Sequence, residues 1–160
     1  MKKRLLHLSA GFTLIELVIV LGIVAILGSA TLITSRSIER RTLTNAALAL
    51  QADFRHAQRM ALIESRRWQV VFSLDYNRYV VRPSPTLQNR ASLSYTVYLP
   101  HGVRINYINA NANTVVYLPR GTINSGFTIS LRSNNYQIEM TGTVSGGRIA
   151  IREIQRLHTR

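Results

Sequence analysis

A long apolar stretch lies near the start of the chain. Residues 12–33 contain one charged side chain, Glu16, among otherwise apolar or small residues. At a rise of about 1.5 Å per residue, a helix of this length reaches about 33 Å, which is enough to cross the hydrocarbon core of a bilayer. The pattern therefore predicts a transmembrane or filament-core helix at residues 12–34.

An amphipathic pattern follows the apolar stretch. Apolar residues recur in alternating steps of four and three, which is the spacing of one helix face, and most arginines fall on other faces. No proline occurs before Pro83, so nothing forces a helix break as far as Trp68. We predict that the helix continues through an amphipathic half at residues 35–67. The apolar positions are Leu43, Ala47, Leu50, Phe54, Ala57 and Ala61, and the arginines are Arg40, Arg41, Arg55, Arg59 and Arg66.

From Trp68 onward the period changes to two and turn residues become frequent, which predicts an antiparallel β domain at residues 68–160. With the long helix before it, this gives an α+β fold. The expected strands are residues 69–74, 78–82, 92–99, 103–108, 114–118, 127–132, 136–140 and 148–154. Five tyrosines in these strands, which we expect to pack in the core rather than to stack on bases, are Tyr95, Tyr98, Tyr107, Tyr117 and Tyr136.

Charge is the strongest compositional signal. The chain has 20 basic and 7 acidic side chains, a formal charge of +13, and every basic residue after Arg4 other than histidine is an arginine. Such an excess attracts polyanions, and the planar guanidinium matches phosphate oxygens in pairs. Arginine-rich codon usage combined with acidic neighbouring subunits is the alternative explanation. Because the chain has no cysteine, disulfides and thiolate zinc sites are excluded.

The amino terminus permits three processing fates. Basic residues 2–4 precede the apolar span, which orients the chain with its start in the cytoplasm and the rest outside. The segment could be an uncleaved anchor, or a secretory signal cut near the small residues 28–30. A carboxylate such as Glu16 inside an apolar span is costly and usually functional, which favours a third fate.

Residues 11–17, Gly-Phe-Thr-Leu-Ile-Glu-Leu, resemble the class III signal of type IV prepilins and type II secretion pseudopilins. The resemblance implies a leader peptide at residues 1–11, cleavage after Gly11 and methylation of the new terminus, Phe12. It also implies that Glu16 pairs with the terminal ammonium of a neighbouring subunit. Two charges that are each costly in lipid become tolerable as a pair.

The later segments resemble GspH/FimT-type minor pilins. The resemblance covers the helix end at residues 54–61, the basic pair before Trp68, the turn at residues 118–122 and the closing residues 144–149. Within that group the spacing is most similar to the D-type competence pseudopilins. The resemblance implies the type IV pilin fold and a minor subunit of a competence pilus that takes up DNA. The alternatives are a type II secretion minor pseudopilin, and a membrane-tethered binding protein that never polymerises.

This resemblance also implies partners and a location. The expected partners are prepilin peptidase, other major and minor pilins, the inner-membrane assembly platform, the membrane itself and non-specific DNA. The expected location is the cytoplasmic membrane, crossed once with the C-terminal domain outside, followed by an extracellular or periplasmic filament. No cofactor and no metal are expected.

Catalytic motifs are not recognisable in the sequence. The phosphate-loop pattern, the His-Glu-x-x-His pattern and the Gly-x-Ser-x-Gly pattern do not occur, and the four histidines are scattered. His56, on the predicted helix, is expected to be a surface or packing residue. We therefore predict a protein that acts by assembly and not an enzyme.

The C-terminal tail repeats arginine every four residues, at Arg148, Arg152, Arg156 and Arg160. A step of four keeps side chains on one side of a strand, and approximately on one side of a helix. We therefore predict that these arginines form a row that binds DNA, and that Ile149 and Ile151 face the core on the opposite side. Gly147 and Arg148 resemble the start of the C-terminal Gly-Arg-x-Arg motif of FimT-type pilins, but Ala150 replaces its second arginine. A solvated terminus and an interface with an acidic neighbouring pilin are the alternatives.

Overall fold

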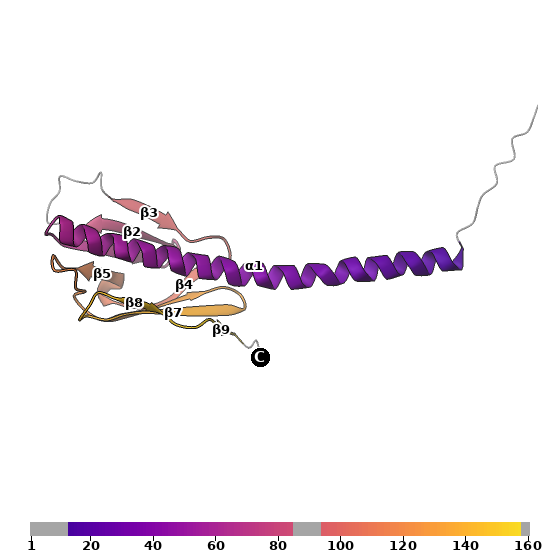
Figure 1. Ribbon diagram of the computed structural model, residues 1–160. Coiled ribbons are helices and arrows are strands. Elements are labelled where there is room, and N and C mark those ends of the chain that lie inside the picture. The colour runs from indigo at the N-terminus through magenta and orange to yellow at the C-terminus, as the bar shows by residue number, and fades with distance from the viewer. Residues whose placement is uncertain (1–12, 85–93, 158–160) are drawn as a thin grey trace, which may run out of the picture. The chain divides into compact units, whose positions relative to one another are not determined.

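A long N-terminal helix, α1 (Leu14–Ile63), dominates the computed structural model (Figure 1). The structure describes residues 13–84 and 94–157, with the side chains of residues 28–36 excepted. The chain divides into two compact units, Met1–Ser37 and Ile38–Arg160. The continuous helix predicted for the two N-terminal segments is thus present, although it ends before residue 67.

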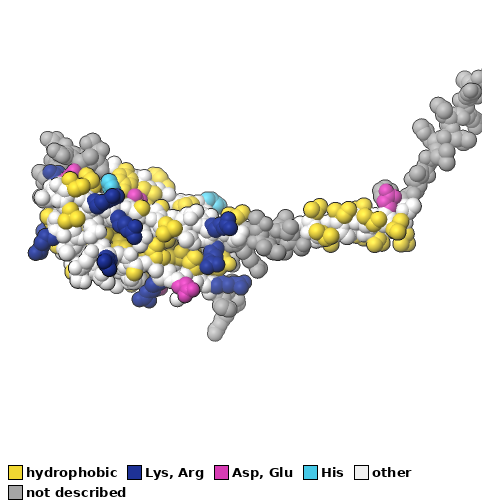
Figure 2. Space-filling view, viewed as in Figure 1, with side chains coloured by type: hydrophobic (Ala, Val, Ile, Leu, Met, Phe, Trp, Pro, Cys, Tyr) yellow, Lys and Arg dark blue, Asp and Glu magenta, His cyan; other side chains and the backbone are white. Residues whose placement is uncertain are grey.

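The described part of the first unit is an apolar segment of α1. Large hydrophobic side chains between Leu14 and Leu27 are each at least 45% exposed, and Figure 2 shows this part of α1 as almost wholly hydrophobic. An apolar surface of this kind is typical of a segment that is covered by other chains or by lipid. No helix within the described residues is both long and apolar enough to span a membrane.

The second unit contains two antiparallel sheets beside the second half of α1. One sheet has the order β3-β2-β1-β5, and the other has the order β4-β6-β7-β8 with β9 also paired to β7. The strands are β1 (Trp68–Ser73), β2 (Arg78–Pro83), β3 (Tyr95–Tyr98), β4 (Arg104–Asn109), β5 (Thr114–Tyr117), β6 (Phe127–Arg132), β7 (Tyr136–Gly142), β8 (Ile149–Ile151) and β9 (Gln155–Arg156), with a short 3₁₀ turn, η2 (Asn111–Asn113), before β5. The α+β architecture expected from the sequence is confirmed.

The apolar face of α1 forms the centre of the core. All six apolar positions that the helical spacing singled out are fully buried. The Phe54 ring lies 6.1 Å from Phe72 and 6.4 Å from Tyr117 in the first sheet, and 5.2 Å from Phe127 in the second. One helical side chain therefore joins both sheets, which explains why a single helix is sufficient to close this core.

The helix ends at Ile63 because the next residues adopt a C-terminal cap. Ser65 has a φ of 50°, its N–H donates to the Leu62 carbonyl at 3.4 Å, and the Arg66 N–H donates to the Ala61 carbonyl at 3.3 Å. This is the Schellman arrangement, which turns the chain out of the helix. No proline or glycine marks this end, so the sequence pattern overestimated the helix by about one turn.

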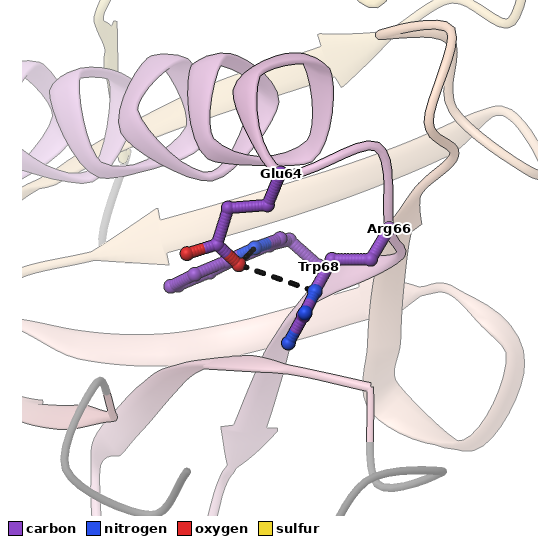
Figure 3. Close-up of polar contacts among 3 residues, drawn as sticks. All are labelled: Glu64, Arg66 and Trp68. Atoms are coloured by element: carbon purple, nitrogen blue, oxygen red, sulfur yellow. Dashed lines mark hydrogen bonds and ion pairs between the residues drawn. The ribbon is translucent and has the colours of Figure 1, made fainter.

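Side chains reinforce the same corner (Figure 3). The Trp68 indole N–H donates to Glu64 at 3.2 Å, and the Arg66 guanidinium lies 3.5 Å from the same carboxylate oxygen. Because Trp68 begins β1 and is itself buried, these contacts fix the direction in which the first strand leaves the helix.

The Asp53 carboxylate on α1 attaches β2 and β3 of the first sheet to the helix. The hydroxyl of Tyr79 on β2 donates to Asp53 at 2.6 Å, and the hydroxyl of Tyr95 on β3 donates to its other oxygen at 2.9 Å. Burial, together with the neighbouring carboxylate, raises the pKa of both tyrosines. Beside them His56 packs its ring against Trp68 and Tyr95, so its predicted role as a packing residue is confirmed.

A second carboxylate, Glu39, attaches the turn between β6 and β7 to α1. The backbone N–H and the side-chain amide of Asn135 each donate to Glu39 at 2.8 Å. Desolvation raises the pKa of Glu39, but the hydrogen bonds from Asn135, together with those from Ser133 and Asn134, outweigh it, and the pKa is lower than usual.

This lowered pKa predicts a pH-dependent contribution of Glu39 to stability. A depressed pKa stabilises the fold above the unfolded value, near 4.5, and the contribution is lost as the pH falls through the folded value. Glu39→Gln should lower the free energy of unfolding by about 1 kcal/mol at pH 7, measured by urea unfolding, and by less at pH 3. Glu153→Gln, at an exposed position, is the control. An equal deficit at both pH values would show that the charge of Glu39 is not involved.

Candidate functional site

Glu16 lies in the first turn of α1 and is exposed. Its backbone N–H donates to the Thr13 hydroxyl at 3.3 Å, so Thr13 caps the helix. A carboxylate in the first turn also interacts favourably with the helix dipole. Gly11 and Phe12, the predicted cleavage and methylation positions, lie outside the described residues.

Arginines dominate the charged surface of the second unit (Figure 2). Among the residues that the structure describes, the ion pairs are Arg66 with Glu64 and Arg152 with Glu139. The other arginines whose side chains the structure describes make no ion pair with a carboxylate of the described residues. Such guanidinium groups remain available to anions from outside.

The C-terminal tail does not form the single strand that was predicted for residues 148–154. It forms β8 and β9, both paired to β7, with an irregular segment between them. Ile151 lies opposite Met140, and Gln155 lies opposite Gln137, where an unbroken ladder would place Ile154. The tail thus carries one extra residue, as in a β-bulge.

This extra residue separates the tail arginines. Directly opposed residues in an antiparallel pair lie on the same face of the sheet. Arg156 is opposite Tyr136, and Tyr136 lies on the same face of β7 as the buried Ile138 and Met140. Arg156 is therefore on the face of β7 that packs against the core. Arg148 and Arg152 are exposed and lie on the other face. The expected single row of arginines is therefore wrong for the described residues, because a one-residue shift in register reverses the face of every later side chain. Arg160 lies outside the described residues.

Arg148 and Arg152 also differ from each other. A guanidinium nitrogen of Arg152 lies 3.7 Å from Glu139, directly across on β7, and its side chain is 65% exposed. An exposed pair of this kind is weak, so it competes little with an external anion. Ile149 and Ile151 pack against the core as predicted, although both are only partly buried.

The turn before Arg148 is fixed by the helix. The Gln58 side-chain amide donates to the carbonyl of Gly121 at 2.7 Å and to that of Gly146 at 3.3 Å. Gly147 has a φ of 59°, and a Cβ there would collide with the Gln58 amide and with the Gly121 carbonyl. Glycine is therefore required, and the turn holds Arg148 beside α1.

Arg148 and Arg55 line the same hollow, which we call the Arg55–Arg148 hollow. Its volume is about 280 Å³, and its walls are Arg55, Gln58, Tyr117, Gly147, Arg148 and Ile149. Sequence reasoning assigned Arg55 to the exposed side of the helix and Tyr117 to the core, and it linked neither to the tail. No spacing in the sequence could have joined them, because α1, β5, β8 and the turn before β8 meet here.

Two of the five strand tyrosines contradict the prediction of core packing. Tyr98 is 65% exposed and Tyr107 is 52% exposed, whereas Tyr117 is fully buried. The Tyr98 ring lies 5.9 Å from the Arg78 guanidinium, which also lies 4.9 Å from the exposed Tyr76 ring. Tyr98 is on the solvent side because the alternation of β3 turns Val97 toward the core. Tyr107 is on the solvent side because the pairing of β4 shifts register between Ile105 and Tyr107, so Ile108 is the next residue that faces the core.

Metal or cofactor chemistry has no evident position in the described residues. Within that part of the chain, no group of three or more histidine, aspartate or glutamate side chains is arranged to hold a metal ion. The part-buried Asp53 is already engaged by two tyrosines, and it acts as a structural acceptor.

The fold matches that of a solved type IV minor pilin. FimU from Pseudomonas aeruginosa PAO1 superposes with a TM-score of 0.57 at 15% identity, covering 72% of this chain and 91% of that one. The minor pseudopilin EpsH from the type 2 secretion system of Vibrio cholerae gives a TM-score of 0.45 at 16% identity, covering 78% of this chain and 94% of that one. No curated protein matches the sequence. The type IV pilin fold expected from the sequence is confirmed.

Family models match both halves of the sequence. Residues 6–32 match the prokaryotic N-terminal methylation motif, which implies processing by prepilin peptidase and assembly with other pilins. Residues 46–147, more than half of the chain, match the type II transport protein GspH, and the chain belongs to this family. It is a minor pilin or pseudopilin of a type IV pilus or a type II secretion system, a class of structural subunits rather than enzymes. The narrower likeness to D-type competence pseudopilins stays a prediction.

Proposed function

We propose that this subunit serves a competence pilus and contributes to the capture of DNA during natural transformation. The observation that carries the proposal is the set of described arginines without a carboxylate partner in a chain of charge +13. Phosphate backbones bind such surfaces without sequence preference and with strong dependence on salt. The first contacts are Arg148, which is unpaired among the described residues, and Arg152, whose exposed ion pair with Glu139 is weak. Arg156 and Arg160 are further candidates.

Processing and membrane insertion form part of the same proposal. Prepilin peptidase removes residues 1–11 by cutting after Gly11 and methylates Phe12. Residues 12–34 hold the chain in the cytoplasmic membrane, with the β domain outside, until the assembly platform extracts it. The same segment, with the amphipathic half at residues 35–67, then packs into the filament core. The exposed apolar side chains of the first unit support this sequence of events.

A type II secretion pseudopilin is the second candidate. The match to the GspH family over residues 46–147 favours it. In that case the β domain contacts other minor subunits and exported protein, and the arginines serve the assembly.

DNA titration separates the two candidates. Full-length protein in detergent should bind labelled duplex DNA with an affinity that falls steeply with salt, measured by fluorescence anisotropy. Changing Arg148 and Arg152 to glutamine should reduce the slope of log affinity against log salt by about 0.9 for each phosphate that the variant no longer neutralises. Arg66→Gln combined with Arg67→Gln removes the same charge elsewhere and should leave most of the slope. Absence of binding even at low salt would favour the secretion pseudopilin.

A further inference from the structure

Two exposed tyrosines and one arginine gather at one end of the first sheet, in a group that we call the Tyr76–Arg78–Tyr98 cluster. Arg78 begins β2, Tyr98 ends β3, and the two residues are direct partners in the strand pairing. Tyr76 lies in the turn between β1 and β2. The next residue, Tyr79, turns its hydroxyl to Asp53 on α1, so the alternation of β2 places Arg78 on the opposite, outward face of the sheet.

The Arg78 guanidinium connects the two rings. It donates a hydrogen bond to the Tyr98 hydroxyl at 3.2 Å, and its carbon lies 4.9 Å from the centre of the Tyr76 ring and 5.9 Å from that of the Tyr98 ring. Tyr76 nevertheless remains 69% exposed and Tyr98 65% exposed. Tyrosine and arginine are the side chains in which binding energy is often concentrated, so their association on an open surface indicates a binding site.

Asn77 fixes the position of the cluster. Its φ is 48°, its side-chain amide donates to the Val103 carbonyl at 2.7 Å, and its side-chain oxygen accepts from the Ile105 N–H at 3.0 Å. The Leu99 N–H donates to the Asn77 carbonyl at 3.1 Å. These bonds join the turn that carries Tyr76 to the segment after β3 and to β4. The turn therefore has a defined position before a ligand binds, which lowers the entropic cost of binding.

Positive charge surrounds the two rings. Arg78 makes no ion pair within the described residues, and neither does the exposed Asp75 in the adjacent turn. Arg82 lies four residues further along β2 on the same outward face, and it is exposed and also without an ion pair in that part of the chain. At about 3.3 Å per residue, the two arginines are about 13 Å apart along the strand. The arrangement suits a ligand that combines flat aromatic groups with repeated negative charge.

We infer that the Tyr76–Arg78–Tyr98 cluster binds unpaired bases of single-stranded DNA, with bases stacked on the rings and phosphate at Arg82. This inference rests on the proposed function in DNA capture and deepens it. Stacking of bases on aromatic rings, with arginine beside them, holds single strands without sequence preference. In a duplex the base faces are covered by the neighbouring base pairs, so the rings cannot stack on them. A neutral sugar polymer would leave the guanidinium groups without an anion.

Three labelled ligands test the inference on full-length protein in detergent. They are a DNA strand of about 12 nucleotides without self-complementarity, a stable abasic strand of the same length and charge, and the duplex of the first strand with its complement. Fluorescence anisotropy at low salt should show that the strand with bases binds about tenfold more tightly than the abasic strand, the effect of one stacked base. Equal affinities for these two strands, with duplex binding retained, would overturn the inference and leave the proposed function intact. Absence of binding by all three would overturn both.

Variants assign the preference for bases to the cluster. Tyr76→Ala and Tyr98→Ala should each remove most of the preference and leave the affinity for the abasic strand nearly unchanged. Both side chains are exposed, so the variants should fold normally, which the emission of the buried Trp68 checks. Tyr107→Ala is the matched control, because it removes an exposed ring of the second sheet that has no cation–π contact among the described residues. Arg82→Gln should weaken both strands equally and lower the salt slope by about 0.7.

Two further results separate stacking from other roles of the cluster. Tyr98→Phe keeps the ring and loses only the hydrogen bond with Arg78, so it should retain the preference for bases. A preference that persists in both Tyr76→Ala and Tyr98→Ala would place base binding elsewhere and overturn the site. If these two variants bind the strand as wild type does but enter filaments poorly, the cluster is an interface with a neighbouring subunit, and the inference is likewise overturned.

Discussion

Glu16→Ala is expected to abolish incorporation of this subunit into filaments while leaving the precursor in the membrane fraction. In the proposed filament, Glu16 pairs with the terminal ammonium of a neighbouring subunit in an apolar core. Removing one partner of a buried ion pair costs about 3–5 kcal/mol, because the remaining charge is left without compensation. A penalty of this size corresponds to a decrease of about a hundredfold or more in the association constant. Immunoblots of sheared filaments and of membranes measure the two pools.

Two controls make the Glu16 prediction specific. Glu16→Asp retains the charge and should restore part of the incorporation. Glu153→Ala removes an exposed carboxylate from the tail and should have no effect on assembly. Filament entry of Glu16→Ala at the wild-type level would disprove the pairing role, and loss of the protein from the membrane would point instead to a fault in insertion.

Phe54→Ala is expected to lower the free energy of unfolding by about 3–5 kcal/mol, the usual cost of deleting a buried aromatic ring. The ring is fully buried and contacts side chains from both sheets, so its removal leaves a cavity where three elements meet. Most domains of this size have only about 5–15 kcal/mol of stability. Urea unfolding followed by the emission of Trp68, the single tryptophan and a buried one, measures the change.

A matched truncation on the same helix is the control for Phe54. Leu48 is 50% exposed, so Leu48→Ala should change the free energy of unfolding by less than about 1 kcal/mol. If both variants have the same deficit in stability, Phe54 contributes no more than an exposed side chain of the same helix, and it is not the point that joins the sheets.

Local sequence patterns determined much of the fold. The alternating steps from Leu43 to Ala61 identified the buried face of α1, because helix periodicity depends only on nearby residues. The turns at Asp75 to Asn77 and at Asn134 and Asn135 placed two hairpins correctly for the same reason. The helix end at Ile63 was missed because a serine, and not a glycine, takes the left-handed cap position.

Sequence alone could not determine the register of the tail. The step of four among the arginines holds only while the ladder is regular, and the extra residue between β8 and β9 turns Arg156 to the other face. Similarly, Tyr98 falls on the exposed side of β3, and a register shift between Ile105 and Tyr107 turns Tyr107 to the exposed side of β4. Register depends on which strand lies alongside, and this is a property of the whole sheet.

The sequence by itself determined the class of the protein, because the methylation motif and the order of helix and strands are written in consecutive residues. It also determined the high positive charge. Only the tertiary structure decided which arginines lie together, because the Arg55–Arg148 hollow joins α1, β5, β8 and the turn before β8, and these lie far apart in the chain. The close approach of these elements follows from packing around Phe54 and from the hydrogen bonds of Gln58, and both form only in the folded domain.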